Sequence, residues 1–434
     1  MFERIRRCIY FLSIIFLLTL PVHAYAGNGK IDTGDTTWLL VSAALVMLMT
    51  PGLALFYGGM VRRKNVLGTI MHSFIALAVI TLQWVLIGYS LSFGPDINGF
   101  IGSLKWFALN GVGIEPSDYA PTVPHLAFMI YQAMFAIITP ALISGAFAER
   151  MKFSAYLLFI LLWSTFVYDP VAHWIWGGGW MSKLGVLDFA GGIVVHATAG
   201  VSALAAAIII GKRKGYPQEP MTPHNLPMTV LGAGLLWFGW FGFNAGSALS
   251  SGALATVALV NTHIAAATAT LIWIFIEWMK YGKPTMFGAA TGCIAGLATI
   301  TPAAGFVTPM SALIIGLAAG AICFLGLKAK GVFGYDDSLD AFGVHGIGGV
   351  LGTLSVGLFA TTAINSGGAN GILYGNAKQM ITQIIGAAVA ALYSLVVSVI
   401  ILKVIDWTVG LRIDEDAEIR GVDLAEHGEE GYFL

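Results

Sequence analysis

The sequence predicts an all-α protein that crosses a membrane many times, and two observations carry that prediction. Of 434 residues, 57% are hydrophobic and only 10% are charged, with a mean hydropathy of +0.81. Soluble domains carry about 25% charged residues, so this composition is typical of a bilayer protein. The apolar residues also gather into long runs, and backbone inside lipid must be helical or form a closed barrel. The net charge of −1 gives no sign of a nucleic-acid surface.

The first residues have the order of a secretory signal peptide. Three arginines precede a short apolar run from Cys8 to Leu20, and the small-residue segment Ala24 to Ala26 follows. The run is too short to span a membrane comfortably. We predict cleavage before Gly27, which removes residues 1–26; the alternative is an uncleaved first span.

Eleven apolar stretches follow between residues 27 and 404, each about long enough to cross a membrane as a helix. The eighth is the shortest. The stretches are Thr36 to Gly58, Val66 to Phe93, Val123 to Phe147, Phe153 to Trp176, Gly191 to Ile210, Leu226 to Ser247, Leu254 to Met279, Phe287 to Thr301, Phe306 to Leu327, Ala341 to Ala360 and Ala377 to Val404.

Basic residues in the connecting loops predict the orientation. Alternate loops hold twelve lysines and arginines, as in the segment Arg62 to Lys64, whereas the loops between them hold only Lys105, Lys183 and Lys378. Because basic residues are retained on the cytoplasmic side, the mature N-terminus is expected outside and the C-terminus inside the cytoplasmic (inner) membrane.

Two short segments echo each other: "VHATAG" contains His196 and "VHGIGG" contains His345. They lie in the fifth and tenth stretches, so the echo has a period of five helices. Because five is odd, the second unit must run through the membrane in the opposite sense. This predicts an inverted five-plus-five repeat with the working site near the midplane.

Burial at equivalent points of opposed repeats would bring the two imidazoles face to face. A lone histidine in such a helix is more often structural, but a matched pair favours function because burying ionisable groups in a membrane is costly. Desolvation and mutual repulsion disfavour double protonation, so we expect the pair to be neutral or to share one proton. Such a pair suits a small, neutral guest that can hydrogen-bond.

Three aromatic clusters fall at one level by this topology. They are "YQAMF" in the third stretch, "AHWIWGGGW" at the end of the fourth and "WFGWFGFNAGS" at the end of the sixth. They could form the ordinary interfacial aromatic belt. They could instead form a cation-π site at the outer mouth, where a desolvated cation gains about 2 kcal/mol per good contact.

Two aspartates precede the histidine segments. Asp188, in "LDFAGG", is expected to cap the fifth helix, and its charge could also support an outer cation site. Asp340, in "DAFGVHG", is expected to cap the tenth helix in the matching way.

Several of these segments together resemble the ammonium transporter family. The resemblance rests on "YQAMFAIITPALISGAFAER", "LDFAGGIVVH", "TPHNLPM", "WFGFNAGS" and "FGVHG", and it runs from about Thr36 to the tail. It implies eleven spans, an inverted repeat, a pore within each subunit and a homotrimer.

The resemblance also implies roles for individual residues. The chain departs from many members at Tyr131, where phenylalanine is common, and Asp169 lies in a variable segment and receives no role. The implied roles are an outer ammonium site at Trp176, Phe135 and Ser247 supported by Asp188, a phenyl gate at Phe135 and Phe243, and pore residues His196, His345 and Trp240.

The tail, residues 405–434, is acidic and too polar to insert into a membrane. Composition alone predicts a solvated end on the cytoplasmic side. In bacterial relatives a similar tail takes part in docking a P-II signalling protein, so the resemblance implies that partner here.

We therefore expect ammonium to be captured outside, to lose a proton and to pass as ammonia along an apolar pore. An ammonium sensor that signals through its tail and an electroneutral Rhesus-type gas channel are the alternatives. Trp176 and Ser247 argue against the gas channel, because that branch generally lacks both. The motifs contain no nucleophile with its base, metal-ligand cluster or phosphate loop, so we expect no enzyme activity, cofactor or metal.

Overall fold

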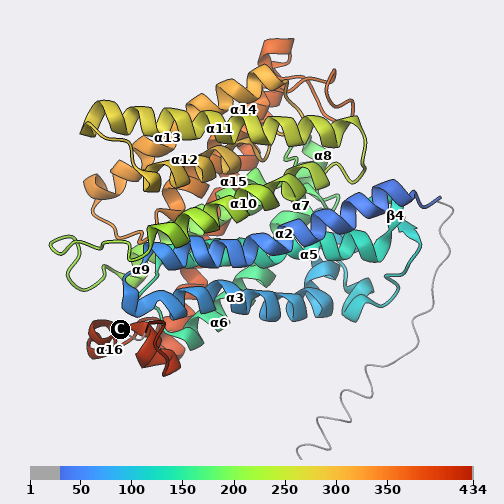
Figure 1. Ribbon diagram of the computed structural model, residues 1–434. Helices are drawn as coiled ribbons and strands as arrows, with labels where there is room; N and C mark the ends of the chain where they lie inside the picture. The colour runs from blue at the N-terminus through green and yellow to red at the C-terminus, as the bar shows by residue number, and fades with distance from the viewer. Residues whose placement is uncertain (1–29, 433–434) are drawn as a thin grey trace, which may run out of the picture.

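The structure, a computed structural model, describes residues 30–432 of the chain. The predicted signal peptide, residues 1–26, lies outside the described residues. Long helices run side by side in one bundle, with the connecting segments at its two ends (Figure 1). The predicted all-helical class is confirmed.

Within residues 30–432, ten helical segments are long and apolar enough to cross a membrane, which is one fewer than the eleven stretches that we predicted. The predicted eighth stretch is an apolar helix of only 15 residues, α12. The ten segments are Thr33–Met60, Arg63–Phe93, His125–Ala146, Phe153–Leu184, Gly192–Ile210, Leu226–Gly246, Ala253–Tyr281, Pro309–Phe333, Phe342–Phe359 and Ala377–Thr408.

The elements that build these segments follow in chain order. The α-helices are α2 (Thr33–Met60), α3 (Val66–Gln83), α4 (Tyr89–Phe93), α5 (His125–Ile143), α6 (Phe153–Trp163), α7 (Asp169–Ile175), α8 (Trp180–Leu184), α9 (Thr198–Ile210), α10 (Leu226–Gly246), α11 (Ala253–Tyr281), α12 (Met286–Ile300), α13 (Pro309–Phe333), α14 (Ile347–Phe359), α15 (Ala377–Thr408) and α16 (Glu415–Arg420). The 3₁₀ turns are η1 (Arg63–Asn65), η3 (Leu104–Leu109), η4 (Ser144–Ala146) and η8 (Ile372–Tyr374). Two small antiparallel hairpins join β1 (Asp96–Ile97) to β2 (Ile101–Gly102) and β3 (Pro116–Ser117) to β4 (Ala120–Pro124).

Four of the spans contain a π-helical turn that the apolar pattern did not predict. The turns are η2 (Trp84–Gly88), η5 (Ser164–Tyr168), η6 (Gly192–Ala197) and η7 (Phe342–Gly346). A π-turn inserts one extra residue and so re-aims the side chains around it, and such turns are frequent at functional sites. Two of the four contain the histidines of the echoed segments.

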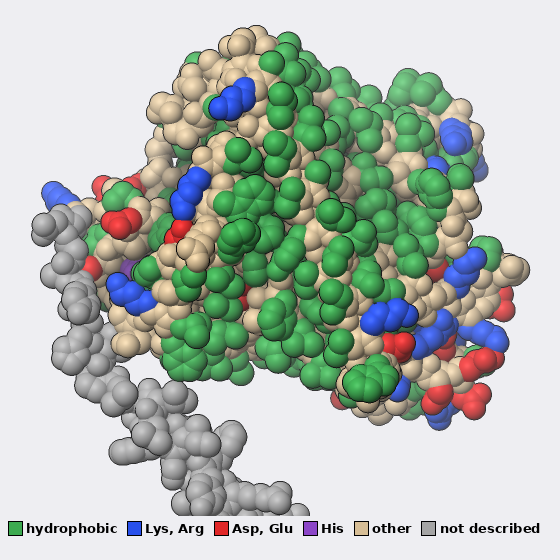
Figure 2. All heavy atoms as spheres, turned by 180° about the vertical axis from the view of Figure 1, so that it is seen from behind, with side chains coloured by type: hydrophobic (Ala, Val, Ile, Leu, Met, Phe, Trp, Pro, Cys, Tyr) green, Lys and Arg blue, Asp and Glu red, His purple; other side chains and the backbone are tan. Residues whose placement is uncertain are grey.

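Small residues bring the helices into close contact. Helix α2 lies along α10 (Figure 1), and a Cβ added to Gly232 of α10 would lie only 2.3 Å from the backbone nitrogen of Phe56. Close packing of this kind is how helices associate inside a bilayer. The outward faces are apolar instead: Leu82, Leu325 and Leu392 are each more than 60% exposed. Figure 2 shows such hydrophobic side chains covering the middle of one face, with charged side chains toward the ends.

The tail is folded onto one end of the bundle, which corrects the prediction of a merely solvated segment. It forms α16 and a π-turn, η9 (Asp423–His427). The Asp423 carboxylate accepts a hydrogen bond from the Gly68 amide in the first turn of α3, at 2.8 Å. The Glu426 carboxylate accepts one from the Phe153 amide at the start of α6, at 2.9 Å. The tail thus caps two membrane helices.

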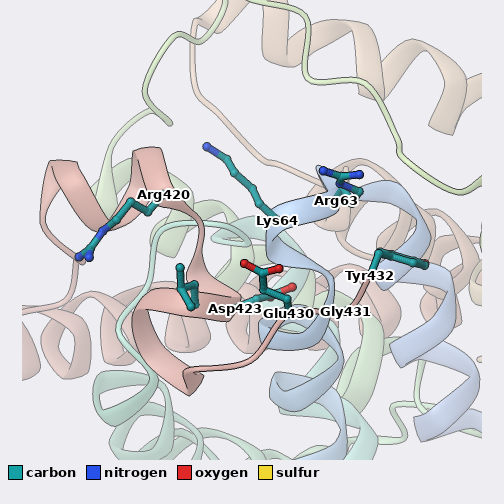
Figure 3. Close-up of a pocket in the computed structure, with 8 residues that line it drawn as sticks. Arg63, Lys64, Arg420, Asp423, Glu430, Gly431 and Tyr432 are labelled. Carbon is teal, nitrogen blue, oxygen red and sulfur yellow. The ribbon is translucent and has the colours of Figure 1, made fainter. Parts of the chain in front are cut away.

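A hollow of about 210 Å³ remains between the tail and the start of α3 (Figure 3). Arg63 and Lys64 come from the loop before α3, and Arg420, Asp423 and Glu430 come from the tail. The Lys64 ammonium donates to the Glu418 carbonyl of α16 at 3.2 Å, which fastens the tail further. We call this end of the bundle the tail end.

The two caps give the first prediction. Replacing Asp423 and Glu426 together with alanine should release residues 415–430, because each lost cap costs about 1 kcal/mol. Hydrogen exchange of the full-length protein in detergent should show faster exchange in this segment and in the first turns of α3 and α6. Glu429→Ala is the control, since that side chain is exposed. Equal exchange in the double variant and the control would contradict the capping role.

Candidate functional site

A hollow of about 250 Å³ opens at the end of the bundle opposite the tail. It lies where α7 and α10 end, since both spans begin at the tail end. Its walls are aromatic and apolar with three polar groups. The lining residues are Phe93, Tyr119, Phe128, Gln132, Phe135, Ile175, Trp176, Phe189, Ser247 and Leu249. Trp176, Phe135 and Ser247, which come from three separate spans, are therefore brought together here.

Asp188 organises the wall behind Trp176. Its carboxylate accepts hydrogen bonds from four consecutive amides, those of residues 191 to 194, at 2.6 to 3.1 Å. This is the predicted cap of the fifth span, with Gly191 supplying the left-handed backbone (φ 112°) that the turn requires. The Asp188 carbonyl accepts a hydrogen bond from the Trp176 indole at 2.8 Å. One residue thus fixes both the start of the helix and the tryptophan ring.

Ser247 presents its hydroxyl oxygen at the edge of the hollow. It donates to the Phe243 carbonyl one helical turn earlier, at 2.8 Å, so its oxygen lone pairs are left to accept hydrogen bonds. Tyr131 is fully buried, and its hydroxyl oxygen lies 2.9 Å from the Phe243 carbonyl and 3.1 Å from Ser247 Oγ. Tyr131 therefore holds the end of α10 in place.

Two phenyl rings close the floor of the hollow. The ring centroids of Phe135 and Phe243 are 4.3 Å apart, and both side chains are about 1% exposed. The Phe135 ring also meets Trp176 nearly edge-on, with centroids 6.0 Å apart and planes at 85°. Phe135 lines the hollow and Phe243 lines the lumen described below, so the two rings lie between these spaces.

The two histidines lie together beyond the phenyl pair. The His196 and His345 rings are nearly parallel, at 13°, with centroids 5.2 Å apart, and His196 lies 6.0 Å from Phe243. Both are buried, and within residues 30–432 neither nitrogen of His196 nor Nδ1 of His345 has a hydrogen-bond partner. Unpaired buried polar atoms are unusual, and they are typical of a place where a ligand or water binds.

The space beside the histidines is a narrow apolar lumen. Its free volume is about 10 Å³, roughly what one water molecule needs. The lumen is lined by Met49, Leu53, Phe56, Ile138, Leu142, Val195, His196, Leu236, Trp240, Phe243, Ile294 and His345. Trp240 stacks on His196 at 5.4 Å and 20°, and its indole donates to Thr301 Oγ1 at 2.9 Å, which holds the ring against the imidazole.

Glycines in the echoed segments explain how the imidazoles meet. A Cβ added to Gly200 would lie 2.0 Å from the backbone nitrogen of Gly346, and one added to Gly349 would lie 2.5 Å from the Gly192 carbonyl oxygen. The two spans therefore touch backbone to backbone, which only glycine permits. The two spans also run in opposite directions. The span that contains His196 ends at the tail end, where the Arg412 guanidinium donates a hydrogen bond to the Ile210 carbonyl. The span that contains His345 begins at the tail end.

The cap of the tenth span corrects a sequence prediction. Asp337, not Asp340, accepts hydrogen bonds from the amides of Ala341 and Phe342, at 3.1 and 2.8 Å. Asp340 has a left-handed backbone (φ 62°) and pairs with Lys330 instead. Burial, and then repulsion by Asp340, raise the pKa of Asp337 to about 6. A helix cap is set by which side chain reaches the free amides, and spacing alone did not distinguish the two carboxylates.

Two further polar residues were given no role in the sequence analysis, Gln132 and Asp169. Gln132 lines the hollow and precedes Phe135 by three residues, so both lie on one helix face; that spacing was a usable signal. Asp169 is fully buried and is not among the lining residues, and its carboxylate accepts a hydrogen bond from the Gln83 side-chain amide at 2.7 Å. This contact joins the second and fourth spans.

Comparisons with known proteins agree with one another. The family described as "Ammonium Transporter Family" matches residues 37–432. The ammonium transporter of Bacillus subtilis is 54% identical over 400 residues, covering 92% of this chain and 98% of its own. The crystal structure of Mep2 from Candida albicans aligns with a TM-score of 0.86 at 38% identity, over 93% of this chain and 91% of that one. A structure entitled "Sensor Amt Protein" aligns at 0.84 and 30% identity, over 91% and 98%.

The backbone contact at the histidines gives the second prediction. Gly200→Ala places a methyl group against the Gly346 backbone, which cannot rotate away, so the folded state should lose about 3 kcal/mol. Thermal unfolding in detergent should show a clear fall in Tm. Gly252→Ala is the matched control, because nothing lies within 4 Å of the added methyl group. Equal Tm values for the two variants would contradict the close contact.

Proposed function

Since the chain belongs to the ammonium transporter family, we propose that it carries ammonium nitrogen through the lumen beside His196 and His345. The observation that carries the proposal is the buried pair of imidazoles with unpartnered nitrogen atoms at the end of an aromatic hollow. A guest that can donate and accept hydrogen bonds, and that is small enough for the lumen, fits this arrangement. Ammonia meets both requirements.

The hollow at Trp176 is the proposed capture site for ammonium. The Trp176 and Phe135 rings attract a cation through their π faces, and Ser247 Oγ accepts one of its N–H groups. None of the described lining residues is a carboxylate, so a captured cation is not held by a full opposite charge. The Asp188 carboxylate lies behind the wall with its charge taken up by four amides, and it adds a weaker negative potential.

The phenyl pair of Phe135 and Phe243 is the proposed gate. A dry apolar constriction excludes hydrated ions, because the hydration shell has to be shed before the ion can enter. Ammonium can avoid that cost by leaving its proton behind and entering as ammonia. Potassium has no proton to lose, so the gate selects against it although the two ions are similar in size.

The imidazole pair is the proposed support for ammonia beyond the gate. A neutral imidazole offers one N–H donor and one acceptor, so two stacked rings can both accept from and donate to the guest. The neighbouring Trp240 ring holds His196 in place. Neither ring carries a fixed positive charge in this state, so an incoming proton or ammonium is not repelled before it reaches the gate.

The finer architecture is proposed with the function. At 1.5 Å per residue, the 15-residue helix α12 covers about 22 Å of a hydrocarbon core of about 30 Å, and we propose it as a short eleventh crossing. The opposed directions of the two histidine spans support the proposed inverted five-plus-five repeat, and the family resemblance supports eleven spans with one pore in each subunit. A homotrimer is expected from the family resemblance.

The proposed location is the cytoplasmic (inner) membrane, with the mature N-terminus outside and the tail inside. The excess of lysine and arginine in the loops at the tail end supports this orientation. The folded tail also offers a P-II signalling protein a defined surface to bind, rather than a flexible strand. The Trp176 hollow then faces outward, as a capture site requires.

The capture site gives the third prediction. Trp176→Ala should weaken the apparent affinity for ammonium about 30-fold, because it removes about 2 kcal/mol of cation-π attraction. Ser247→Ala should weaken it by about fivefold, because it removes one hydrogen bond of about 1 kcal/mol. Concentration-dependent uptake of labelled methylammonium into proteoliposomes measures both. Leu86→Ala, on an outward-facing side chain of the second span, is the control. If Trp176→Ala reached half-maximal uptake at the same methylammonium concentration as the unaltered protein, the assignment of the capture site would be wrong.

The histidine pair gives the fourth prediction. A double His196→Ala, His345→Ala variant should lose about 30-fold in ammonium flux or admit potassium, since two hydrogen bonds of about 1 kcal/mol each disappear. The control is His72→Phe, because His72 is also buried but lies among Phe147, Phe153 and Tyr156, outside the lumen lining. Flux and potassium exclusion equal to the unaltered protein would refute the proposed pathway.

Two alternatives make different predictions in the same vesicles. An electroneutral gas channel gives uptake without current when ammonium is added to a solid-supported membrane. A sensor that binds ammonium and signals through its tail gives neither current nor uptake. Current and uptake are therefore both measured on the unaltered protein, with Trp176→Ala as the reference for loss of binding. Together they distinguish the proposed transporter from the gas channel and from the sensor.

A further inference from the structure

A histidine outside the lumen lies next to the outer hollow. His173 belongs to α7, three residues before Trp176, and its side chain is fully buried. Its Nδ1 atom lies 2.9 Å from the Ser92 carbonyl oxygen, and its Nε2 atom lies 3.0 Å from a carboxylate oxygen of Asp96. The ring therefore joins the fourth span to the end of the second span and to β1.

Both ring nitrogens face oxygen atoms that accept hydrogen bonds. A backbone carbonyl has no proton to donate, and a neutral imidazole has only one N–H. Asp96 is ionised, because its carboxylate also accepts from the Lys183 ammonium at 2.6 Å and from the Gly99 amide at 2.7 Å. Lys183, and then His173, lower the pKa of Asp96 to about 2. A neutral ring would set a nitrogen lone pair against an oxygen lone pair, so the two contacts together require a doubly protonated ring.

The backbone around His173 also favours a positive charge. The second span ends at Phe93 and α7 ends at Ile175, so the ring belongs to the last turn of one helix and bonds a carbonyl in the last turn of another. The carboxyl end of a helix carries a partial negative charge, which stabilises a protonated histidine. Asp96 adds a full negative charge beside the ring. These three groups offset the cost of burying an imidazolium.

Other titratable groups surround this end of α7. Asp169 lies one turn earlier on the same helix, and its carboxyl oxygen is 3.4 Å from Ser92 Oγ. The Tyr119 hydroxyl donates to the Phe93 carbonyl at 2.8 Å and to the Gly177 carbonyl at 3.2 Å. The neighbouring elements add Tyr89, Tyr168, Asp188, His196 and Tyr393. Within residues 30–432, none of these side chains makes a hydrogen bond to the His173 ring, so Asp96 is the charge that the ring meets directly.

The contacts of His173 hold two walls of the outer hollow together. Ser92 immediately precedes Phe93, and His173 precedes Trp176 by three residues; both aromatic residues line the hollow. The two spans touch beside the ring, because a Cβ added to Gly177 would lie 2.0 Å from the Ser92 carbonyl oxygen. The His173 carbonyl also accepts a hydrogen bond from the Gly177 amide at 3.1 Å, which fixes the turn that follows Trp176.

We infer that His173 is a positioning residue of the outer hollow, and that it holds Phe93 and Trp176 in place only while its ring carries two protons. The inference rests on the proposed capture of ammonium at this hollow and on the proposed orientation, in which the hollow faces outward. When the external pH rises and the ring loses one proton, it loses either the Ser92 contact or the Asp96 contact. Capture then weakens for a reason separate from the charge of the guest.

The protonation state of the ring is measured without transport. Nitrogen-15 NMR of the full-length protein, labelled at histidine and reconstituted in lipid, separates an imidazolium from a neutral ring, and His173→Gln identifies the signal. At about pH 7 both His173 nitrogens should be protonated in the unaltered protein and only one in Asp96→Asn. In that variant the asparagine amide donates to Nε2 while Nδ1 still donates to the Ser92 carbonyl, so a neutral ring keeps both contacts.

Uptake of labelled methylammonium into proteoliposomes measures the consequence for capture. Methylammonium, like a lysine side chain, stays charged from about pH 6 to about pH 9. Over this range the half-saturating concentration should rise about fivefold in the unaltered protein, the factor expected for one lost hydrogen bond. It should stay low in Asp96→Asn and stay high in His173→Gln. Asp118→Asn is the matched control and should keep the rise, because it removes the same charge from an exposed residue between β3 and β4.

Several results would overturn the inference. A His173 ring that is neutral at about pH 7 would do so, and so would an equal rise of half-saturation in the unaltered protein and in His173→Gln. Loss of the rise in Asp118→Asn as well as in Asp96→Asn would indicate general surface charge instead. If His173→Gln does not fold, Asp96→Asn still decides, because it changes the protonation of the same ring in the NMR spectrum. Failure of the capture site itself has a different sign, namely unchanged half-saturation in Trp176→Ala.

Discussion

The contact between the backbones at Gly200 and Gly346 sets the distance on which the rest of the site depends. Side chains at these positions would push the two spans apart, and the imidazoles of His196 and His345 would no longer face each other. The repeated segments around His196 and His345 therefore combine glycines that pack two helices together with the histidines of the candidate site. The glycines bring the helices together, and each histidine occupies the position that this contact buries.

Several buried or partly buried carboxylates of this protein bind backbone amides at the starts of helices. Asp188 gives its carboxylate to four amides and its carbonyl to Trp176, and it leaves the hollow itself free of a full negative charge. At the tail end Asp337, Asp423 and Glu426 likewise accept from helix amides. These four carboxylates bind free amides in the first turns of helices, where the helix dipole favours a negative charge.

The sequence was most informative where the signal was local or repeated. His196, His345 and the cap at Asp188 were predicted because each depends on neighbours within a few residues, and the family resemblance supplied Trp176, Phe135 and Ser247. The π-turns were not predicted, because an extra residue in a helix leaves no mark on an apolar run. The folded tail was missed because Asp423 and Glu426 bind amides more than 250 residues away, and only tertiary structure creates those partners.

The fourth span has a consequence of its own. The Glu426 carboxylate accepts a hydrogen bond from the Phe153 amide at one end of the span, and Trp176 lies at the other end. One π-helical turn, Ser164–Tyr168, lies between them. The tail and the Trp176 indole ring are therefore joined through one continuous span, although they lie at opposite ends of the bundle.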